Sequence, residues 1–76
     1  MQIIFKYGEL FCGPGGLALG AINANLFIGE NEFLIEHAWA NDVDKMACAT
    51  YRKNIALSNP ESVICGDVRE LNIQKL

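Results

Sequence analysis

Four glycines within eight residues constrain the fold of this chain more than any other feature of its sequence. They stand in the segment Glu9-Leu10-Phe11-Cys12-Gly13-Pro14-Gly15-Gly16-Leu17-Ala18-Leu19-Gly20, between an apolar, strand-like run and small residues that suit a helix. Glycine allows positive φ and lets a ligand approach the bare backbone. A strand, a glycine turn and a helix in this order bring a helix N-terminus against a nucleotide-like cofactor. The segment therefore predicts a cofactor-binding loop without specifying the cofactor.

Composition limits the chain to one small domain. Its 76 residues are 51% hydrophobic and 20% charged, which is too apolar for a disordered segment. The net charge of −3 does not favour phosphate binding, and the one basic cluster, Lys45, Arg52 and Lys53, is expected to be a solvated helix face. No apolar run reaches membrane-spanning length and residues 1–6 lack a secretory signal, so we expect a cytoplasmic protein.

The three cysteines and the single histidine do not form a metal or disulfide pattern. Cys12, Cys48 and Cys65 contain no Cys-x-x-Cys pair and leave one thiol over, so we interpret them as reduced thiols. His37 has no ligand partner at metal-binding spacing, and we expect a structural histidine. Trp39, on the same expected strand, is predicted to belong to the core.

Strand-like and helix-like patterns alternate along the chain. The expected elements, in order, are a strand over 5–11, a helix from 15 or 16 to 23, a connector over 24–31, a strand over 33–40, a helix over 45–57 and a strand over 62–65. Asp44 is predicted to cap the second helix, and Ser58-Asn59-Pro60 to end it. This alternation implies an α/β fold in which right-handed crossovers join three parallel strands.

Acidic and apolar residues follow the expected strands, where ligands of open α/β sheets bind. Asp42 can accept both hydroxyls of a ribose, and Asp67 can accept from an exocyclic adenine amine beside the Val68 amide. Phe11 and Val43 are candidates for the apolar faces on either side of the ring. Together with the glycine loop, these residues predict an adenosine-shaped site.

A second interpretation is a site for NAD. Residues 13–18 fit a loose Gly-x-Gly-x-x-Ala dinucleotide fingerprint, with Asp42 as the acid at the end of the next strand. That pattern does not require the Gly15-Gly16 pair or Asp67, and a pyrophosphate gives no reason for the carboxylate of Glu9. A carboxylate there suits a cationic ligand such as a sulfonium or an α-amino group. The residues therefore favour a cationic adenosine cofactor, with NAD as the alternative.

Three blocks of this sequence resemble the signature motifs of DNA (cytosine-5)-methyltransferases. They are residues 9–17, which read Glu-Leu-Phe-Cys-Gly-Pro-Gly-Gly-Leu, residues 41–54, which begin Asn-Asp-Val-Asp, and Gly66-Asp67-Val68. The blocks occur in the family's order and span most of the chain. The resemblance implies a partial Rossmann-like methyltransferase fold and S-adenosylmethionine as the cofactor.

The resemblance also assigns cofactor-binding roles, to Glu9, Phe11, Cys12, Gly13, Pro14, Gly15, Gly16, Asp42, Val43, Asp67 and Val68. It places the Gly-Pro-Gly-Gly loop around the methionine portion and Glu9 near the methionine amino group. It places Asp42 on the ribose, and Phe11, Val43, Asp67 and Val68 around the adenine. Asp42 stands where Glu is frequent in the family, which shortens the reach of the carboxylate to the ribose. Val43 stands where an aromatic residue is frequent, which weakens the packing against the adenine.

The catalytic motifs of the family do not occur in these residues. Family members attack cytosine with the thiolate of a Pro-Cys motif, whereas Pro14 and Pro60 precede Gly15 and Glu61 here. We therefore expect residues 1–76 to be the N-terminal cofactor-binding portion of a methyltransferase domain, inactive alone. The parent enzyme is expected to methylate C5 of cytosine in DNA within bacterial restriction–modification. An NAD-binding dehydrogenase fragment and a non-catalytic fragment that associates with a larger partner are the alternatives.

The expected partners follow from this interpretation. DNA would contact segments of the parent enzyme outside this chain, and no membrane is involved. In the full family fold the first strand lies inside the sheet, so here it would be an exposed edge that is prone to pairing. We expect either self-association or a complementary fragment.

Overall fold

The computed structural model describes residues 1–76 and contains a four-stranded sheet with two helices. The strands are β1 (Gln2–Leu10), β2 (Asn25–Ile28), β3 (Asn31–Asp42) and β4 (Val63–Cys65), and the helices are α1 (Gly16–Asn23) and α2 (Lys45–Asn54). Single 3-10 turns lie at Pro60–Ser62, Val68–Glu70 and Ile73–Lys75. The chain is therefore a small domain of the mixed α/β class, as expected.

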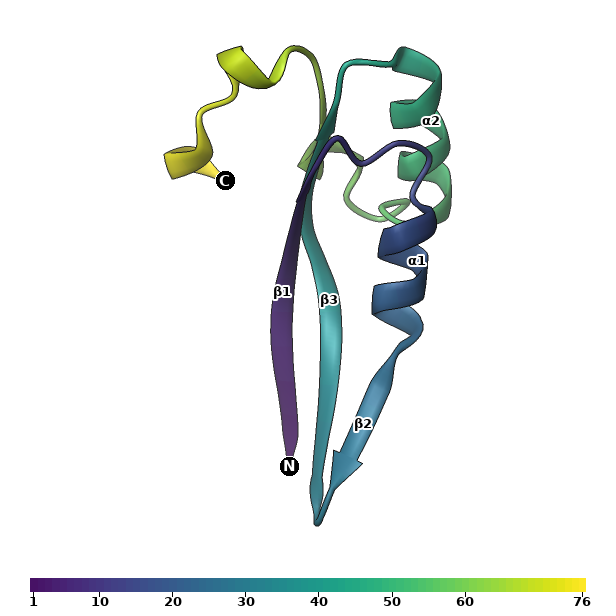
Figure 1. The fold of residues 1–76 in the computed structure, drawn as a ribbon, viewed down its shortest axis with the longest axis vertical. Helices are drawn as coiled ribbons and strands as arrows, with labels where there is room; N and C mark the ends of the chain where they lie inside the picture. The colour runs from purple at the N-terminus through teal and green to yellow at the C-terminus, as the bar shows by residue number, and fades with distance from the viewer.

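β3 is the central strand of the sheet. β1 pairs with it in parallel over most of its length, from Gln2 opposite Glu32 to Leu10 opposite Asn41. The other edge of β3 carries the antiparallel β2 at its start and the parallel β4 at its end. Figure 1 shows β1 and β3 side by side, with the hairpin of β2 and β3 reaching away from the helices.

The segment over residues 24–31 contains a strand and a turn, so the expectation of a plain connector is wrong. Residues Asn25–Ile28 form β2, and Gly29, with a φ of 60°, turns the chain back into β3. Large apolar side chains favour strands, and the antiparallel partner is the next segment of the chain. The sheet is consequently mixed, rather than composed of three parallel strands alone.

The other elements lie near their expected positions but end at different residues. β1 begins before residue 5 and ends at Leu10, because Phe11 leaves the strand with a φ of 54°. β3 extends beyond the expected strand at both ends. Asp44 caps α2, since its Oδ1 accepts from the Met46 amide at 2.9 Å, and α2 ends at Asn54 instead of residue 57.

The two helices lie on one side of the sheet and bury a small cluster of side chains against it (Figure 1). The buried apolar residues are Cys12, Ala18, Ala40, Cys48, Tyr51, Ala56 and Val63. Tyr51 on α2 is the largest of them. Trp39 lies outside this cluster, contrary to expectation. It is half-buried, and its indole packs so closely over Gly8 that a Cβ at Gly8 would overlap with the ring.

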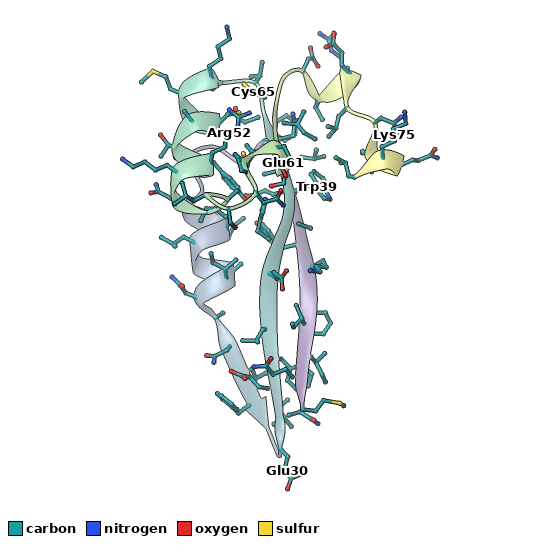
Figure 2. The ribbon with its side chains drawn as sticks, turned by 180° about the vertical axis from the view of Figure 1, so that it is seen from behind. Glu30, Trp39, Arg52, Glu61, Cys65 and Lys75 are labelled. Carbon is teal, nitrogen blue, oxygen red and sulfur yellow. The ribbon has the colours of Figure 1, made fainter.

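Much of the sheet remains open and apolar. β1 pairs only with β3, so its outer edge has no partner strand, and β2 exposes Leu26, Phe27 and Ile28. Figure 2 shows the reverse side, with Glu30 at the tip of the long hairpin. Neither helix has the length and hydropathy needed to span a lipid bilayer. Self-association or pairing with a complementary fragment through β1 stays a prediction.

Candidate functional site

The loops that follow β1, β3 and β4 meet at one end of the sheet, because these three strands run parallel. Backbone hydrogen bonds join them. The Cys12 amide donates to the Asn41 carbonyl at 3.0 Å, and the Gly66 amide donates to the Asp42 carbonyl at 2.9 Å. The first loop carries the exposed Pro14. Three distant parts of the sequence therefore form one surface, at the upper end of Figure 1.

An open cavity of about 170 Å³ lies between these loops. It is lined by Phe11, Asn41, Val43, Gly66, Asp67 and Val68. Phe11 and Val43 are 73% and 71% exposed, so they stand as uncovered apolar walls. The structure thus brings together four residues that sequence analysis placed at separate strand ends, namely Phe11, Val43, Asp67 and Val68.

Asp42 does not line this cavity; its carboxylate holds the glycine loop. Oδ2 accepts from the Gly13 amide at 2.9 Å, and Oδ1 accepts from the Asp44 amide at 2.9 Å. The hydrogen bonds from Asp44 and Gly13 hold the pKa of the Asp42 carboxyl below its usual value. Because a carboxylate offers about four lone-pair sites, Asp42 retains acceptor capacity for a ligand.

Asp67 is held by Arg69, a partner that sequence analysis missed. Its Oδ1 accepts from the Arg69 amide at 2.8 Å, and Arg69 Nε lies 3.0 Å from both carboxylate oxygens. Hydrogen bonds from the side chain and the amide of Arg69 hold the pKa of the Asp67 carboxyl below its usual value. A ligand that donates to Asp67 must therefore share the carboxylate with this guanidinium. An arginine two residues after an acid is the only signal of the pair in the sequence.

The glycines of the loop have two different roles. Gly15, with a φ of 104°, is buried, and a Cβ there would stand 3.0 Å from Ile55 and 3.1 Å from Tyr51. Gly13 has a φ of 57°, and a Cβ at either Gly13 or Gly16 would meet nothing within 4 Å. Gly15 therefore packs the loop against α2, whereas Gly13 and Gly16 leave bare backbone beside open space.

Glu9 turns one carboxylate oxygen into the interior beside Tyr7. Its Oε2 is inaccessible to solvent, and burial raises the pKa of the carboxyl while the neighbouring Tyr7 side chain opposes that rise. Burial also raises the pKa of Cys12 to about 11, with the charges of Asp42 and Glu9 adding to the rise. An inaccessible oxygen cannot contact a ligand directly, so any contact of Glu9 with a cationic ligand would fall to its other oxygen, Oε1.

Asn41 is a further site residue that sequence analysis did not single out. It is 1% exposed, and its Nδ2 donates to the carbonyls of Ile64 at 2.8 Å and Gly66 at 3.1 Å. The side chain therefore fixes the end of β4 to β3 beside the cavity. The signal in the sequence was a polar residue at the start of the second motif.

His37 has the structural role that was expected of it. Its Nδ1 lies 3.0 Å from the Tyr51 hydroxyl and its Nε2 lies 2.7 Å from Ser62 Oγ. Ser62 donates its only hydroxyl proton to the Asn59 carbonyl at 2.7 Å, so it must accept from Nε2–H. Nδ1 then accepts from Tyr51. The network therefore assigns to His37 the neutral tautomer that carries its proton on Nε2. It also connects β3 to α2 and to the turn before β4.

Acid should weaken this network. Burial lowers the pKa of His37, so the unfolded chain takes up the imidazole proton at a higher pH than the folded chain. The stability that neutral His37 contributes is complete above the unfolded pKa of about 6.5 and declines as the pH falls below it. We expect the urea midpoint of unfolding to decrease between about pH 8 and pH 5.5. His37→Gln should remove most of that decrease, and an unchanged profile in this variant would assign the titration to another group.

Comparison with known proteins gives consistent matches. Residues 5–76 match the family model described as C-5 cytosine-specific DNA methylase. The chain is 60% identical over 74 residues to Type II methyltransferase M.BbvI of Brevibacillus brevis, and 36% identical over 67 residues to Type II methyltransferase M.NgoFVII of Neisseria gonorrhoeae. These matches cover 95% and 88% of this chain but only 20% and 14% of the two relatives. No solved structure matches the chain.

Proposed function

The chain belongs to the C-5 cytosine-specific DNA methylase family, and on that premise we propose that residues 1–76 form an S-adenosylmethionine-binding portion of a methyltransferase domain. The family match does not favour the NAD-binding alternative. It also does not favour a non-catalytic fragment that associates with a larger partner.

The cavity between Phe11 and Val43 carries the proposal. Its two apolar walls suit a flat aromatic base, because such rings gain most from contact with apolar and aromatic side chains. Asp67 and the Val68 amide supply an acceptor and a donor at the same cavity, as an adenine edge requires. A larger cavity of about 390 Å³ shares Gly66 and Asp67 with this one, but aliphatic and polar side chains line the rest of it and no aromatic side chain does.

Residues outside the cavity suit the rest of the cofactor. Asp42 has acceptor sites left for the ribose, and the open backbone at Gly13 and Gly16 offers room for the methionine portion. Glu9, at the end of β1, is proposed to receive the α-amino group of the cofactor through its carboxylate. When bound, S-adenosylmethionine supplies a methyl group that its sulfonium activates. Gly15 and Cys12 are buried and support the loop from the core side.

Methyl transfer is proposed for the whole enzyme to which such a portion belongs. The substrate would be C5 of cytosine in DNA, with the nucleophilic thiol and the DNA contacts supplied by segments outside residues 1–76. The names of M.BbvI and M.NgoFVII as Type II methyltransferases support a role in bacterial restriction–modification, in the cytoplasm. In this proposal β1, β3 and β4 are the parallel strands of a Rossmann-like methyltransferase fold.

Phe11→Ala should weaken the binding of S-adenosylhomocysteine about tenfold or more, since stacking on an aromatic side chain contributes about 1–3 kcal/mol per base. Phe27→Ala is the matched control. Phe27 is 66% exposed, close to the 73% of Phe11, but it lies on β2 and away from the cavity. Isothermal titration calorimetry of the wild-type chain and both variants, with NAD as a second ligand, measures the difference.

The proposal requires S-adenosylhomocysteine to bind, Phe11→Ala to weaken that binding and Phe27→Ala to leave it unchanged. Preference for NAD would overturn the cofactor assignment. Equal affinity of Phe11→Ala and Phe27→Ala for S-adenosylhomocysteine would place the adenine outside the cavity. Failure of the folded wild-type chain to bind S-adenosylhomocysteine would contradict a cofactor site complete within residues 1–76.

A further inference from the structure

Two cysteine thiols that the cofactor proposal does not use lie together behind the candidate site. Cys48 comes from α2, and Cys65 ends β4, where it pairs with Asp42 in the strand register. Cys48 Sγ donates to the Asp42 carbonyl at 3.3 Å, and Cys65 Sγ contacts the carbonyl of the next residue, Val43, at 3.8 Å. Both thiols are therefore held against adjacent peptide units at the end of β3.

The two thiols come from elements that pack against each other, α2 and β4, and they differ in exposure. Burial, and then the neighbouring Cys65 thiol, raise the pKa of Cys48 to about 12. Cys48 is fully buried, whereas Cys65 is partly exposed, and both are free thiols. Figure 2 shows Cys65 at the end of the sheet beside α2. An oxidant therefore reaches Cys65 first and leaves Cys48 as the neighbouring thiol.

We propose that Cys48 and Cys65 are an oxidation-sensitive pair, which a small disulfide such as oxidised glutathione converts into an intramolecular disulfide between α2 and β4. The Cys65 thiolate attacks one sulfur of the small disulfide, breaks its S–S bond and releases one thiol. Cys48 then loses its proton and attacks the Cys65 sulfur, which releases the second small thiol. Two protein thiols are oxidised, one small disulfide is reduced, and both protons end on the released thiols.

The disulfide would connect the two sides of the candidate cavity. Residues 66–68, which follow Cys65, form one side, and Val43, which precedes α2, forms the other. Because a cross-link restricts the unfolded chain, the oxidised protein should melt at a higher temperature than the reduced protein. Burial disfavours the Cys48 thiolate, so closure should be slow, on the order of minutes to hours. The proposal does not depend on cofactor binding.

Oxidation of the purified 76-residue chain by oxidised glutathione tests the pair. The remaining thiols are alkylated in denaturant, the chain is digested without reductant, and the peptides are identified by mass spectrometry. We expect a peptide pair that joins Cys48 to Cys65, with Cys12 recovered in alkylated form. Cys12→Ser should keep the cross-link and Cys65→Ser should lose it.

Circular dichroism of each variant establishes that it is folded before oxidation. A cross-link that involves Cys12, or a mixed disulfide on Cys65 that never closes, would overturn the proposal. So would a cross-link that lowers the melting temperature of the wild-type chain, because the native geometry would then oppose the bond. If Cys65→Ser does not fold, the mapping of Cys12→Ser decides the question, since only one pair of thiols remains in that variant.

Discussion

Replacing Gly15 with alanine should destabilise the chain by about 2–5 kcal/mol. Gly15 has a φ of 104°, where a side chain is strained, and the added carbon would stand 3.0 Å from Ile55 and 3.1 Å from Tyr51. Tyr51 is fully buried and belongs to the His37 network, so it has little room to move. The expected loss is a large share of the roughly 4–11 kcal/mol typical of a domain of this size. Urea unfolding followed by circular dichroism measures it as a lower midpoint.

Gly20→Ala is the matched control for this prediction. Gly20 lies within α1, and a Cβ there would meet nothing within 4 Å. Alanine is a better helix former than glycine, so this variant should gain up to about 1 kcal/mol. If the urea midpoint of Gly15→Ala were no lower than that of Gly20→Ala, the close packing between the loop and α2 would be contradicted.

The alternation of strands and helices and the meeting of strand ends could be predicted from the sequence, because each follows from a local pattern and one general rule. The glycine turn marks the start of α1, and an acidic residue marks the start of α2. Parallel strands place their carboxyl ends at one edge of a sheet. Phe11, Val43 and Asp67 could therefore be expected together, and they line one cavity.

The hairpin of β2 and β3 could not be predicted in the same way. The run Leu26-Phe27-Ile28 is too short to show a strand period, and its flanking polar residues are typical of a connector. Its identity as a strand depends on antiparallel pairing with β3, in which Leu26 lies opposite Phe33. Such a register is a tertiary property, so composition alone does not contain it.

The hydrogen-bond partners of the site residues could not be predicted from the sequence either. Asp42 was expected to face a ligand, yet both of its oxygens accept backbone amides, one of them from Gly13 in a different loop. Arg69 on Asp67 and the buried amide of Asn41 depend on loop geometry in the same way. Motifs indicate which residue types gather at a site, whereas donors and acceptors are paired by the three-dimensional path of the backbone.

Asp42→Ala should weaken the binding of S-adenosylhomocysteine by about a hundredfold or more on the proposed function. A hydrogen bond to a charged group contributes about 1.5–3 kcal/mol, and two ribose hydroxyls would lose their acceptor. The variant also removes the acceptor of the Gly13 amide, so the loop loses an anchor. Asp44→Ala is the matched control, because it removes the neighbouring carboxylate and the cap of α2 at a cost of about 1 kcal/mol in stability without touching the proposed ribose contact.

The two consequences of Asp42→Ala, a lost ribose contact and a loosened loop, can be separated with a second ligand. A 2′-deoxyribose analogue of S-adenosylhomocysteine lacks one of the hydroxyls that Asp42 is proposed to accept. In the wild-type chain the analogue should bind more weakly than the parent ligand, and in Asp42→Ala the two should bind equally, because the acceptor is gone from both complexes. If the analogue loses as much affinity as the parent ligand on substitution, Asp42 acts only through its bonds to the Gly13 and Asp44 amides. The ribose assignment would then be wrong, while the cavity between Phe11 and Val43 would still be tested independently by the Phe11→Ala titration.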